Sequence, residues 1–453
     1  MNPTYTDKGS LQIFVTAGET PDPIPEARVR ITDPTDGRVL EEAATDASGQ
    51  TPFIELPAPP MEWSVEEGAA EQRPYAVYNV TVFAPERETL HLGGVELLPA
   101  GRSIQRAPLA PARSGGFNVH NVLLAPHALW GEPSSRPEEA EVKPLPEPEG
   151  LVVLPEPVIP EFVVVHDGRP EDASARNYWV RFKDYVKNVA CSEIYSTWRT
   201  EAIKANVLAI TSFTLNRVYT EWYRGKGYDF TVTSSTAFDQ SYSHGRTIFE
   251  EIGVVVDDLF TTYVTKEGIA QPLFTQYCDG RRTQCSGLSQ WGSQALGEQG
   301  WDAVSILKKY YGSEIYLKSA EKVEGVPLSY GGEVLTLGSE GEAVRTIQVQ
   351  LNRIADNFPA IPKIPADGVY GPATQAAVTE FQKIFHLPQT GSVDFAVWYE
   401  ISNVFVAVLP ACRKAARQGT SRLAAKAGKI VPFYYNPRLL CRRYLVFFRL
   451  YPY

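Results

Sequence analysis

The 453-residue chain has few cysteines, no long apolar run and no excess of positive charge. Its five cysteines are too few for a disulfide-stapled scaffold. No stretch reaches the roughly 18 consecutive apolar residues of a membrane-spanning helix, and the N-terminus lacks the apolar run of a secretory signal. A formal charge of −10 argues against nucleic acid as a partner, because broad nucleic-acid binding needs a basic surface. We therefore expect a soluble protein made in the cytoplasm, without a transmembrane segment.

The N-terminal part has the pattern of a β-sheet domain. With 43% apolar residues the chain can build ordinary cores, and its length predicts about three domains. Residues 8–110 alternate apolar and polar side chains, for example over 77–83, between Asp-Gly and Ser-Gly turns, so we expect an all-β sandwich. The order of strands and turns through 24–29 and 45–50 resembles the carboxypeptidase regulatory-like, or transthyretin-like, domain. That resemblance implies a spacer or adhesive unit, and residues 118–124 are a candidate for one more strand.

Two segments have the composition of connecting or terminal regions. Eight prolines alternate with glutamates across 131–160, and proline blocks both helix and sheet hydrogen bonds. Residues 111–162 are therefore predicted to form an extended linker that holds two domains apart. Residues 409–453 carry ten Lys or Arg and no Asp or Glu. This basic tail is either a binding segment for an anionic wall polymer or membrane surface, or a poorly ordered segment without amphipathic regularity.

Near the C-terminus, two amphipathic helices flank a stiff loop. Apolar residues recur at intervals of three and four in 344–354 and in 378–385, and a third short helix is expected at about 395–401. Between them, residues 367–372 read Asp-Gly-Val-Tyr-Gly-Pro. We expect a tight Asp-Gly turn, a positive φ at Gly371, and a proline in the first turn of the second helix.

Residues 334–405 closely resemble the type-one peptidoglycan-binding domain, a three-helix bundle. The resemblance rests on the loop and helices above and on Leu-Gly-Ser-Glu-Gly-Glu-Ala-Val before the first helix. It implies that peptidoglycan glycan strands are a partner, with Tyr370, Thr374 and Gln375 as candidate ligand contacts. The alternative is that the Asp and Gly residues of the loop only hold the helices apart.

The central part, residues 163–318, carries the only catalytic hypothesis. Residues 189–195 lead into a buried helix at about 198–222, and residues 287–292 (Gly-Leu-Ser-Gln-Trp-Gly) precede a second helical pattern that ends near 312. These stretches, in this order, resemble the stage II sporulation protein D family, also called the SpoIID/LytB domain. The resemblance implies an α+β domain whose relatives cleave peptidoglycan glycan strands or stimulate amidases.

Within that family, the glutamate that corresponds to Glu193 is the catalytic acid of a lytic transglycosylase. The resemblance also implies a catalytic role for Lys204 and ligand contacts at Gln290 and Trp291. Such an acid needs a raised pKa, which burial supplies, whereas the N-terminus of the following helix lowers it. The alternative is that Glu193 merely stabilises the positive end of that helix.

The central part also departs from the family pattern. Thr211 stands where an arginine is expected, and residues 228–242, which correspond to the family's zinc-holding segment, contain no Cys or His. We therefore expect no metal and no cofactor, and the Asp239-Gln240 pair is a candidate hydrogen-bonded brace in place of the ion. Cys278 and Cys285 are candidates for a bridge in an oxidising compartment.

Three functions are compatible with the sequence. They are a peptidoglycan lytic transglycosylase, a catalytically inactive wall-binding scaffold, and an adhesive or structural spore-associated protein with other wall or spore proteins as partners. A wall ligand conflicts with the missing secretory signal, unless the protein belongs to the mother cell or spore of a sporulating bacterium or is released by lysis. An open cleft lined by Glu193, Lys204 and Gln290 would favour the enzyme.

Overall fold

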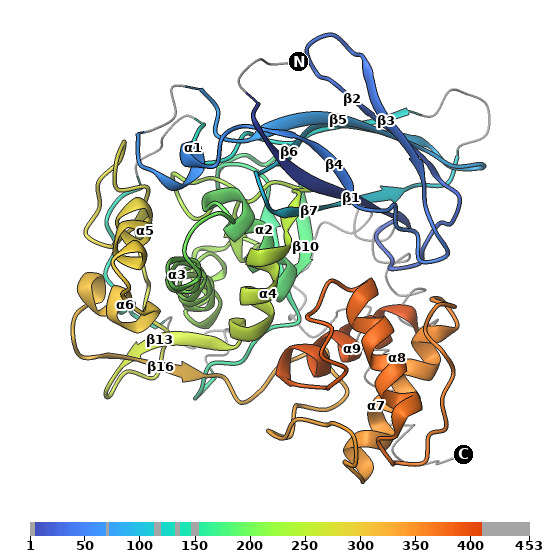
Figure 1. Ribbon diagram of the computed structural model, residues 1–453. Helices are drawn as coiled ribbons and strands as arrows, with labels where there is room; N and C mark the ends of the chain where they lie inside the picture. The colour runs from blue at the N-terminus through green and yellow to red at the C-terminus, as the bar shows by residue number, and fades with distance from the viewer. Residues whose placement is uncertain (1–4, 69–71, 113–118, 132–135, 146–153, 410–453) are drawn as a thin grey trace. The chain divides into compact units, whose positions relative to one another are not determined.

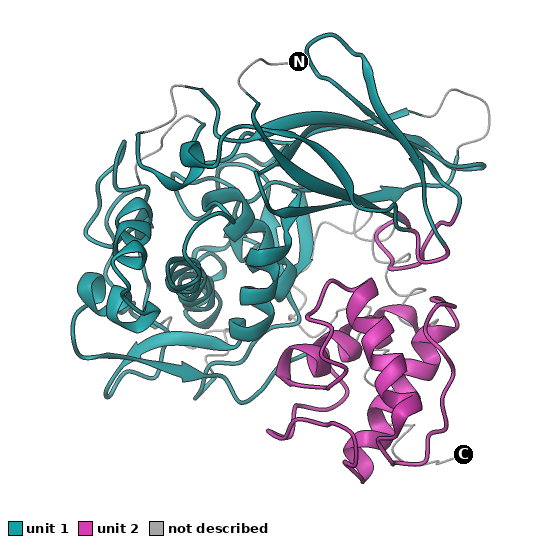
Figure 2. Cartoon of the chain, in the orientation of Figure 1, with its two compact units in different colours: residues 1–15, 26–46, 50–324 teal, residues 16–25, 47–49, 325–453 magenta. Residues whose placement is uncertain are grey.

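The computed structural model describes residues 5–68, 72–112, 119–131, 136–145 and 154–409. The basic tail predicted for 409–453 therefore lies outside the described residues from 410 onward. The chain divides into two compact units (Figure 2): most of the chain up to residue 324 forms the first, and the second contains the residues from 325 onward with two short N-terminal loops. Within the described residues, no helix is both long and apolar enough to cross a membrane.

Two sheets make up the N-terminal part of the first unit. The four-stranded sheet has the order β12-β7-β1-β4, from Ile248–Phe249, Arg102–Leu109, Asp7–Ala17 and Ile54–Ala58. The five-stranded sheet has the order β3-β2-β5-β6-β8, from Val39–Ala44, Arg28–Thr32, Ala76–Phe83, Thr89–Leu97 and Val119–Leu123. Strand β5 alternates buried and less buried residues, as the sequence pattern predicts. The extra strand expected at 118–124 is confirmed as β8, which pairs with β6 in parallel.

The sheets and the middle part of the chain are joined. Strand β12 comes from the middle part, yet it pairs with β7 of the N-terminal part. Arg246 of the middle part forms a fully buried ion pair with Glu96 of β6, with Nη2 2.7 Å from Oε2. The indole Nε1 of Trp198 donates to the carbonyl oxygen of Ser64 in the short helix α1, Glu62–Val65. The expectation that a linker holds these parts apart is therefore wrong.

The described part of the proline-rich segment packs against the middle part. Glu139 receives two hydrogen bonds from the guanidinium of Arg217, at 2.9 and 2.7 Å. Lys143 is buried, and its ammonium lies 2.8 Å from the Glu139 carboxylate. Prolines prevent regular structure here, but the interspersed charged side chains find buried partners.

The middle part is mixed α/β. Its strands are β9 (Phe162–His166), β10 (Asn177–Arg181), β11 (Val232–Thr233), β13 (Thr262–Lys266), β14 (Tyr277–Cys278), β15 (Leu288–Ser289) and β16 (Ile315–Ser319). Its helices are α2 (Phe182–Glu193), α3 (Thr200–Tyr219), α4 (Glu250–Leu259), α5 (Gln290–Glu298) and α6 (Ala303–Tyr311), with a 3-10 turn at Arg224–Lys226. Helix α3 is buried along most of its length, and Figure 1 shows it among α2, α4, α5 and α6. A helix that is buried on all sides needs little amphipathic periodicity.

Three helices form most of the second unit. They are α7 (Glu342–Ala355), α8 (Pro372–Ile384) and α9 (Phe395–Val408). The predicted apolar stripe of α7 is confirmed, because Val344, Ile347, Leu351 and Ile354 are buried. The prediction for Gly371 is wrong: its φ is −93°, and the positive φ of this loop, +80°, is at Gly368. The tight Asp-Gly turn therefore supplies the left-handed residue, and Gly371 only leads into α8.

Candidate functional site

Glu193 is the last residue of helix α2, which the sequence analysis missed. The following helix α3 begins only at Thr200, so Glu193 lies at a helix C-terminus and not at an N-terminus. The negative end of the helix dipole disfavours a carboxylate, which is opposite to the effect expected from the sequence. The missed helix does have a signal: its buried apolar residues Phe182, Tyr185, Val186, Val189 and Ala190 have helical spacing.

The carboxyl of Glu193 is buried among polar groups. Glu193 is only 4% exposed. Its Oε1 accepts a 2.6 Å hydrogen bond from the Ser241 backbone N–H, and its Oε2 accepts a 2.5 Å hydrogen bond from the Tyr277 hydroxyl. Burial raises the pKa of Glu193 to about 7, against the smaller lowering effects of these two hydrogen bonds and of the Arg136 charge. A carboxyl with this pKa exchanges its proton near neutral pH.

Gln240 fixes the position of Tyr277. Its Nε2 donates to the Tyr277 hydroxyl oxygen at 3.0 Å. Its Oε1 accepts from the hydroxyls of Tyr185, on α2, and Thr214, on α3. Burial raises the pKa of the Tyr277 hydroxyl well above its usual value, so this group acts as a proton-bearing donor. The network thus joins two helices and strand β14 at the Glu193 carboxyl.

Asp239 is the centre of a second buried network. Its Oδ1 accepts from Arg217 Nε at 2.8 Å, and its Oδ2 accepts from the Tyr223 hydroxyl and from both donors of Thr233. The hydrogen-bonded brace predicted for Asp239 and Gln240 is therefore present. The zinc ion of the resembling family does not fit this segment, because both oxygens of Asp239 already serve protein donors. Throughout the described residues, no cluster of three or more His, Cys, Asp or Glu side chains could hold a metal ion.

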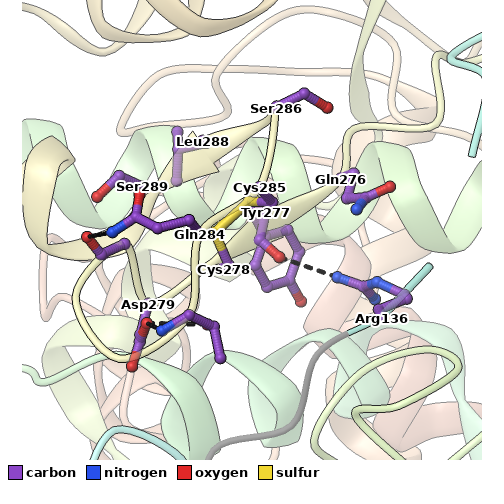
Figure 3. The surroundings of a disulfide bond; sticks show 12 residues. Arg136, Gln276, Tyr277, Cys278, Asp279, Gln284, Cys285, Ser286, Leu288 and Ser289 are labelled. Carbon is purple, nitrogen blue, oxygen red and sulfur yellow. Dashed lines mark hydrogen bonds between the residues drawn. A yellow bond between two sulfur atoms is a disulfide. The ribbon is translucent and has the colours of Figure 1, made fainter. Parts of the chain in front are cut away.

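A disulfide lies directly after Tyr277. Cys278 and Cys285 are bonded, which resolves the alternatives that the sequence left open. Figure 3 shows the bond beside Tyr277 and Arg136, whose Nη2 donates to the Tyr277 carbonyl oxygen at 2.9 Å. Inside the closed loop, Asp279 accepts hydrogen bonds from the backbone N–H groups of Arg282 and Thr283. These contacts fix the chain on both sides of the disulfide, and they thereby hold Tyr277 next to Glu193.

The other central residues singled out from the sequence lie in different surroundings. The ammonium of Lys204 is 2.7 Å from Glu201, which also accepts from the Ala303 backbone N–H at the start of α6. Gln290 and Trp291 begin α5 and are 5% and 8% exposed. The Trp291 ring packs against Trp198 at 5.1 Å and against Tyr195 at 6.1 Å. The hydrogen bonds described for the Glu193 carboxyl come from Ser241 and Tyr277, and not from Lys204, Gln290 or Trp291.

Thr211 is fully buried on α3, and its hydroxyl has no hydrogen-bond partner among the described residues. The position where the resembling family has arginine is thus occupied by a small polar group inside the core.

In the second unit, the candidate ligand residues differ in exposure. Tyr370 is 1% exposed, and its hydroxyl donates to the Gly391 carbonyl oxygen at 2.9 Å. Thr374 is also buried, and its hydroxyl accepts from Gln348 Nε2. Gln375 is only half-buried, so it alone of the three offers a substantial surface to a ligand.

Two buried glutamines hold the loops of this unit, and the sequence analysis missed both. Gln348 on α7 donates to Asp367, to the Val369 carbonyl oxygen and to Thr374, and it accepts from the Gly368 N–H. Gln382 on α8 similarly donates to Thr390 and Ser392 and accepts from the Gly391 N–H. The available signal was a polar residue directly beside an apolar helical stripe, at 347–348 and at 381–382.

A comparison with protein families gives two matches to this chain. A family model described as stage II sporulation protein matches residues 173–257, which include Glu193, Lys204 and Thr211. A second family model, described as a peptidoglycan binding domain, matches residues 340–401. A search of curated proteins found no match. The two family matches support a cell-wall-related protein with a peptidoglycan-binding domain at its C-terminal end.

Proposed function

We propose that this cell-wall-related protein binds peptidoglycan through residues 334–405 and cleaves glycan strands through residues 163–318, as a lytic transglycosylase. Glu193 is the single acid and base of the proposed reaction. The observation that carries the proposal is its buried carboxyl with a pKa of about 7, held between two hydrogen-bond donors. A carboxyl with the usual pKa of 4.5 would hold too little proton near neutral pH to act as an acid.

The proposed reaction needs no water and no metal. Protonated Glu193 gives its proton to the oxygen that links C1 of N-acetylmuramic acid to the next N-acetylglucosamine, and the C1–O bond breaks with its electrons on that oxygen. The resulting carboxylate then takes the proton of the muramyl 6-hydroxyl while O6 bonds to C1. The products are a new 4-hydroxyl end and a 1,6-anhydro end, and Glu193 is protonated again.

Ser241 and Tyr277 are positioning residues in this proposal. Each donates to one oxygen of Glu193, so each favours the carboxylate that is needed for the second step. Burial favours the acid that is needed for the first step. The balance of the two effects lets one group serve in both steps.

Lys204 was expected to take part in catalysis, whereas its ammonium pairs with Glu201. Glu201 also accepts from the first residue of α6. We propose that Lys204 stabilises the contact between α3 and α6 and has no part in the proton transfers.

A second candidate function is an inactive wall-binding scaffold. Two observations favour it: Glu193 is 4% exposed, and Thr211 replaces the arginine of the resembling family. An acid must reach its substrate, so this candidate predicts binding without cleavage.

The test is incubation of the full chain with purified glycan strands, followed by mass spectrometry of the released ends. The proposal predicts 1,6-anhydro ends from wild type and none from Glu193→Gln, with wall binding retained in both. Glu201→Gln is the matched control, because it removes a carboxylate from the same region without touching Glu193. Reducing ends would mean hydrolysis and contradict the mechanism. Absence of any product, with binding retained, would leave the scaffold as the function.

A further inference from the structure

A cavity of about 460 Å³ lies within the first unit, and its lining includes neither of the two residues that donate to Glu193. Three segments line it: the edge strand β8 with the residues after it, the hairpin between β9 and β10, and residues 242–244. Its polar side chains include His120, Asn121, Asp167, Arg176, Tyr178 and His244. Its volume is within the range of sites for small organic molecules. The N-terminal sheets and the middle part therefore build this cavity together.

One wall of the cavity is an ordered aromatic surface. The rings of Tyr178 and His244 are stacked, with centroids 4.1 Å apart and planes at 7°. The Tyr242 hydroxyl lies 3.4 Å from His244 Nδ1, and the Tyr242 ring stacks on Tyr185 of α2. Because Tyr185 is fully buried, this wall is anchored to the core. Rings fixed in this way offer a flat apolar face at little cost in side-chain entropy.

The remaining walls carry exposed groups for hydrogen bonding. Arg176 presents a guanidinium, Asp167 a carboxylate and Asn121 an amide, and all three residues are exposed. Their backbones are fixed, since the Asp167 N–H donates to the Arg176 carbonyl oxygen and Asn121 is in register with His91 of β6. A guanidinium recognises a carboxylate with two parallel hydrogen bonds, and amides and carboxylates recognise hydroxyl and acetamido groups.

We propose that this cavity is a binding site for an N-acetylated sugar that bears a carboxyl group, as a unit of a glycan strand. The apolar face of the sugar ring lies on the outer face of the stacked pair of Tyr178 and His244. Its carboxylate pairs with Arg176, and its hydroxyl and acetamido groups bond to Asn121 and Asp167. A ligand with several phosphates fits less well, because the described lining has a single arginine and the carboxylate of Asp167 would repel the additional negative charge. This inference rests on the proposed function and gives the N-terminal sheets a binding role in place of a spacer role.

The cavity also has a covalent connection to the candidate active site. Ser241, whose N–H donates to Glu193, directly precedes Tyr242, Ser243 and His244 of the cavity wall. A sugar bound on this wall lies along the loop that holds the catalytic carboxyl. The cavity is thus suited to hold a strand on one side of the cleaved bond.

The test is hydrogen–deuterium exchange of the full chain with soluble peptidoglycan disaccharide, N-acetylglucosaminyl-N-acetylmuramic acid, titrated to saturation. We expect slower exchange at 119–126, 166–178 and 241–245. Tyr178→Ala should raise the disaccharide concentration that gives half-maximal protection by about tenfold. This is the effect of losing a contact worth about 1.4 kcal/mol. Arg176→Gln should weaken protection similarly for the disaccharide, and much less for N,N′-diacetylchitobiose, which keeps both acetamido groups and lacks the carboxyl group.

Trp179→Ala is the matched control. Trp179 is next to Tyr178 on strand β10, is 52% exposed and packs edge-on against Phe162, so its side chain lies on the opposite face of the strand. This larger truncation should leave protection at the cavity unchanged. Thermal unfolding identifies any variant that fails to fold, and Arg176→Gln, at an exposed position, then tests the site in place of Tyr178→Ala.

The outcomes separate the two proposals. Protection confined to 334–405 would overturn the cavity site and leave wall binding by the C-terminal domain intact. Equal protection by the disaccharide and by N,N′-diacetylchitobiose, with no effect of Arg176→Gln, would overturn the carboxylate contact. Protection at the cavity without any release of anhydro ends would support this site while the transglycosylase proposal failed.

Discussion

The hydroxyl of Tyr277 donates a 2.5 Å hydrogen bond to Oε2 of Glu193, although the two residues are 84 positions apart in the chain. Helix α2 supplies the carboxyl and strand β14 supplies the hydroxyl. The disulfide after Tyr277 and the hydrogen bond from Gln240 hold this donor in place. This hydrogen bond lowers the pKa of the candidate acid against the larger effect of burial, and it can be removed by deleting a single oxygen atom.

Tyr277→Phe should raise the pKa of Glu193 above about 7, because the lost hydrogen bond favours the carboxylate. Since the protonated form starts the proposed reaction, the alkaline limb of the pH–rate profile should move to higher pH. The measurement is anhydro-end release between pH 5 and 9. Tyr310→Phe is the control, because that hydroxyl lies against Ser289. A limb that stays in place or moves to lower pH would contradict the assigned role of Tyr277.

Glu193 should make the folded state less stable as the pH rises. Its pKa is about 7 when folded, against 4.5 ordinarily, so between these values the folded state holds a proton that the unfolded state has released. The free energy of unfolding should therefore fall through this window by about 3 kcal/mol from this group alone. Glu193→Gln removes the titration. The measurement is the free energy of unfolding by urea at pH 5 and at pH 8. From pH 5 to pH 8, wild type should lose more of this free energy than Glu193→Gln does. Equal losses in the two proteins would refute the raised pKa.

Breaking the buried pair of Glu96 and Arg246 should destabilise the N-terminal sheets and the middle part together. Glu96→Ala leaves the Arg246 guanidinium buried without its carboxylate, a loss of about 3–5 kcal/mol. We expect a single unfolding transition at lower temperature, by circular dichroism at a strand-sensitive and a helix-sensitive wavelength. The control is the exposed ion pair of Arg30 and Glu42. Glu42→Ala breaks this pair and should lower the free energy of unfolding by about 1 kcal/mol or less. Separate transitions for strands and helices would contradict the joined unit.

Two substitutions in the second unit should separate ligand contact from loop stability. Tyr370→Ala removes a buried ring and its hydrogen bond to Gly391, so the free energy of unfolding should fall by about 3–5 kcal/mol. Wall binding should be lost together with this stability. Gln375→Ala changes a half-buried side chain, so co-sedimentation with purified peptidoglycan should weaken while the unfolding temperature stays the same. Loss of binding by a fully stable Tyr370→Ala protein would instead identify Tyr370 as a direct ligand contact.

Chelation should leave the fold and the binding unchanged. The segment that would hold zinc in the resembling family carries Asp239, whose oxygens accept from Arg217 and other protein donors. The prediction is an unchanged unfolding temperature after treatment with a chelator, and no stoichiometric zinc by elemental analysis of the purified protein. Zinc at one ion per chain, released together with a loss of stability, would overturn it.

The sequence by itself predicted the local elements whose pattern repeats over several turns. Helices α7 and α8 follow from apolar residues spaced by three and four, and β5 follows from the alternation of apolar and polar residues over 78–82, because these periods match the geometry of one element. The positive φ was assigned to the wrong glycine, since Gly368 and Gly371 are both compatible with such a turn until their hydrogen bonds are known.

Tertiary structure decided everything that depends on distant partners. The sequence singled out Glu193, but neither the burial that raises its pKa nor Tyr277 and Ser241, which come from other parts of the chain and donate to its carboxyl. It predicted a spacer at 111–162, whereas the buried partners of Glu139 and Lys143 can be recognised only after folding. The physical reason is that hydrophobic periodicity is a local property of the chain, while burial, desolvation and hydrogen-bond partners are properties of the packed whole.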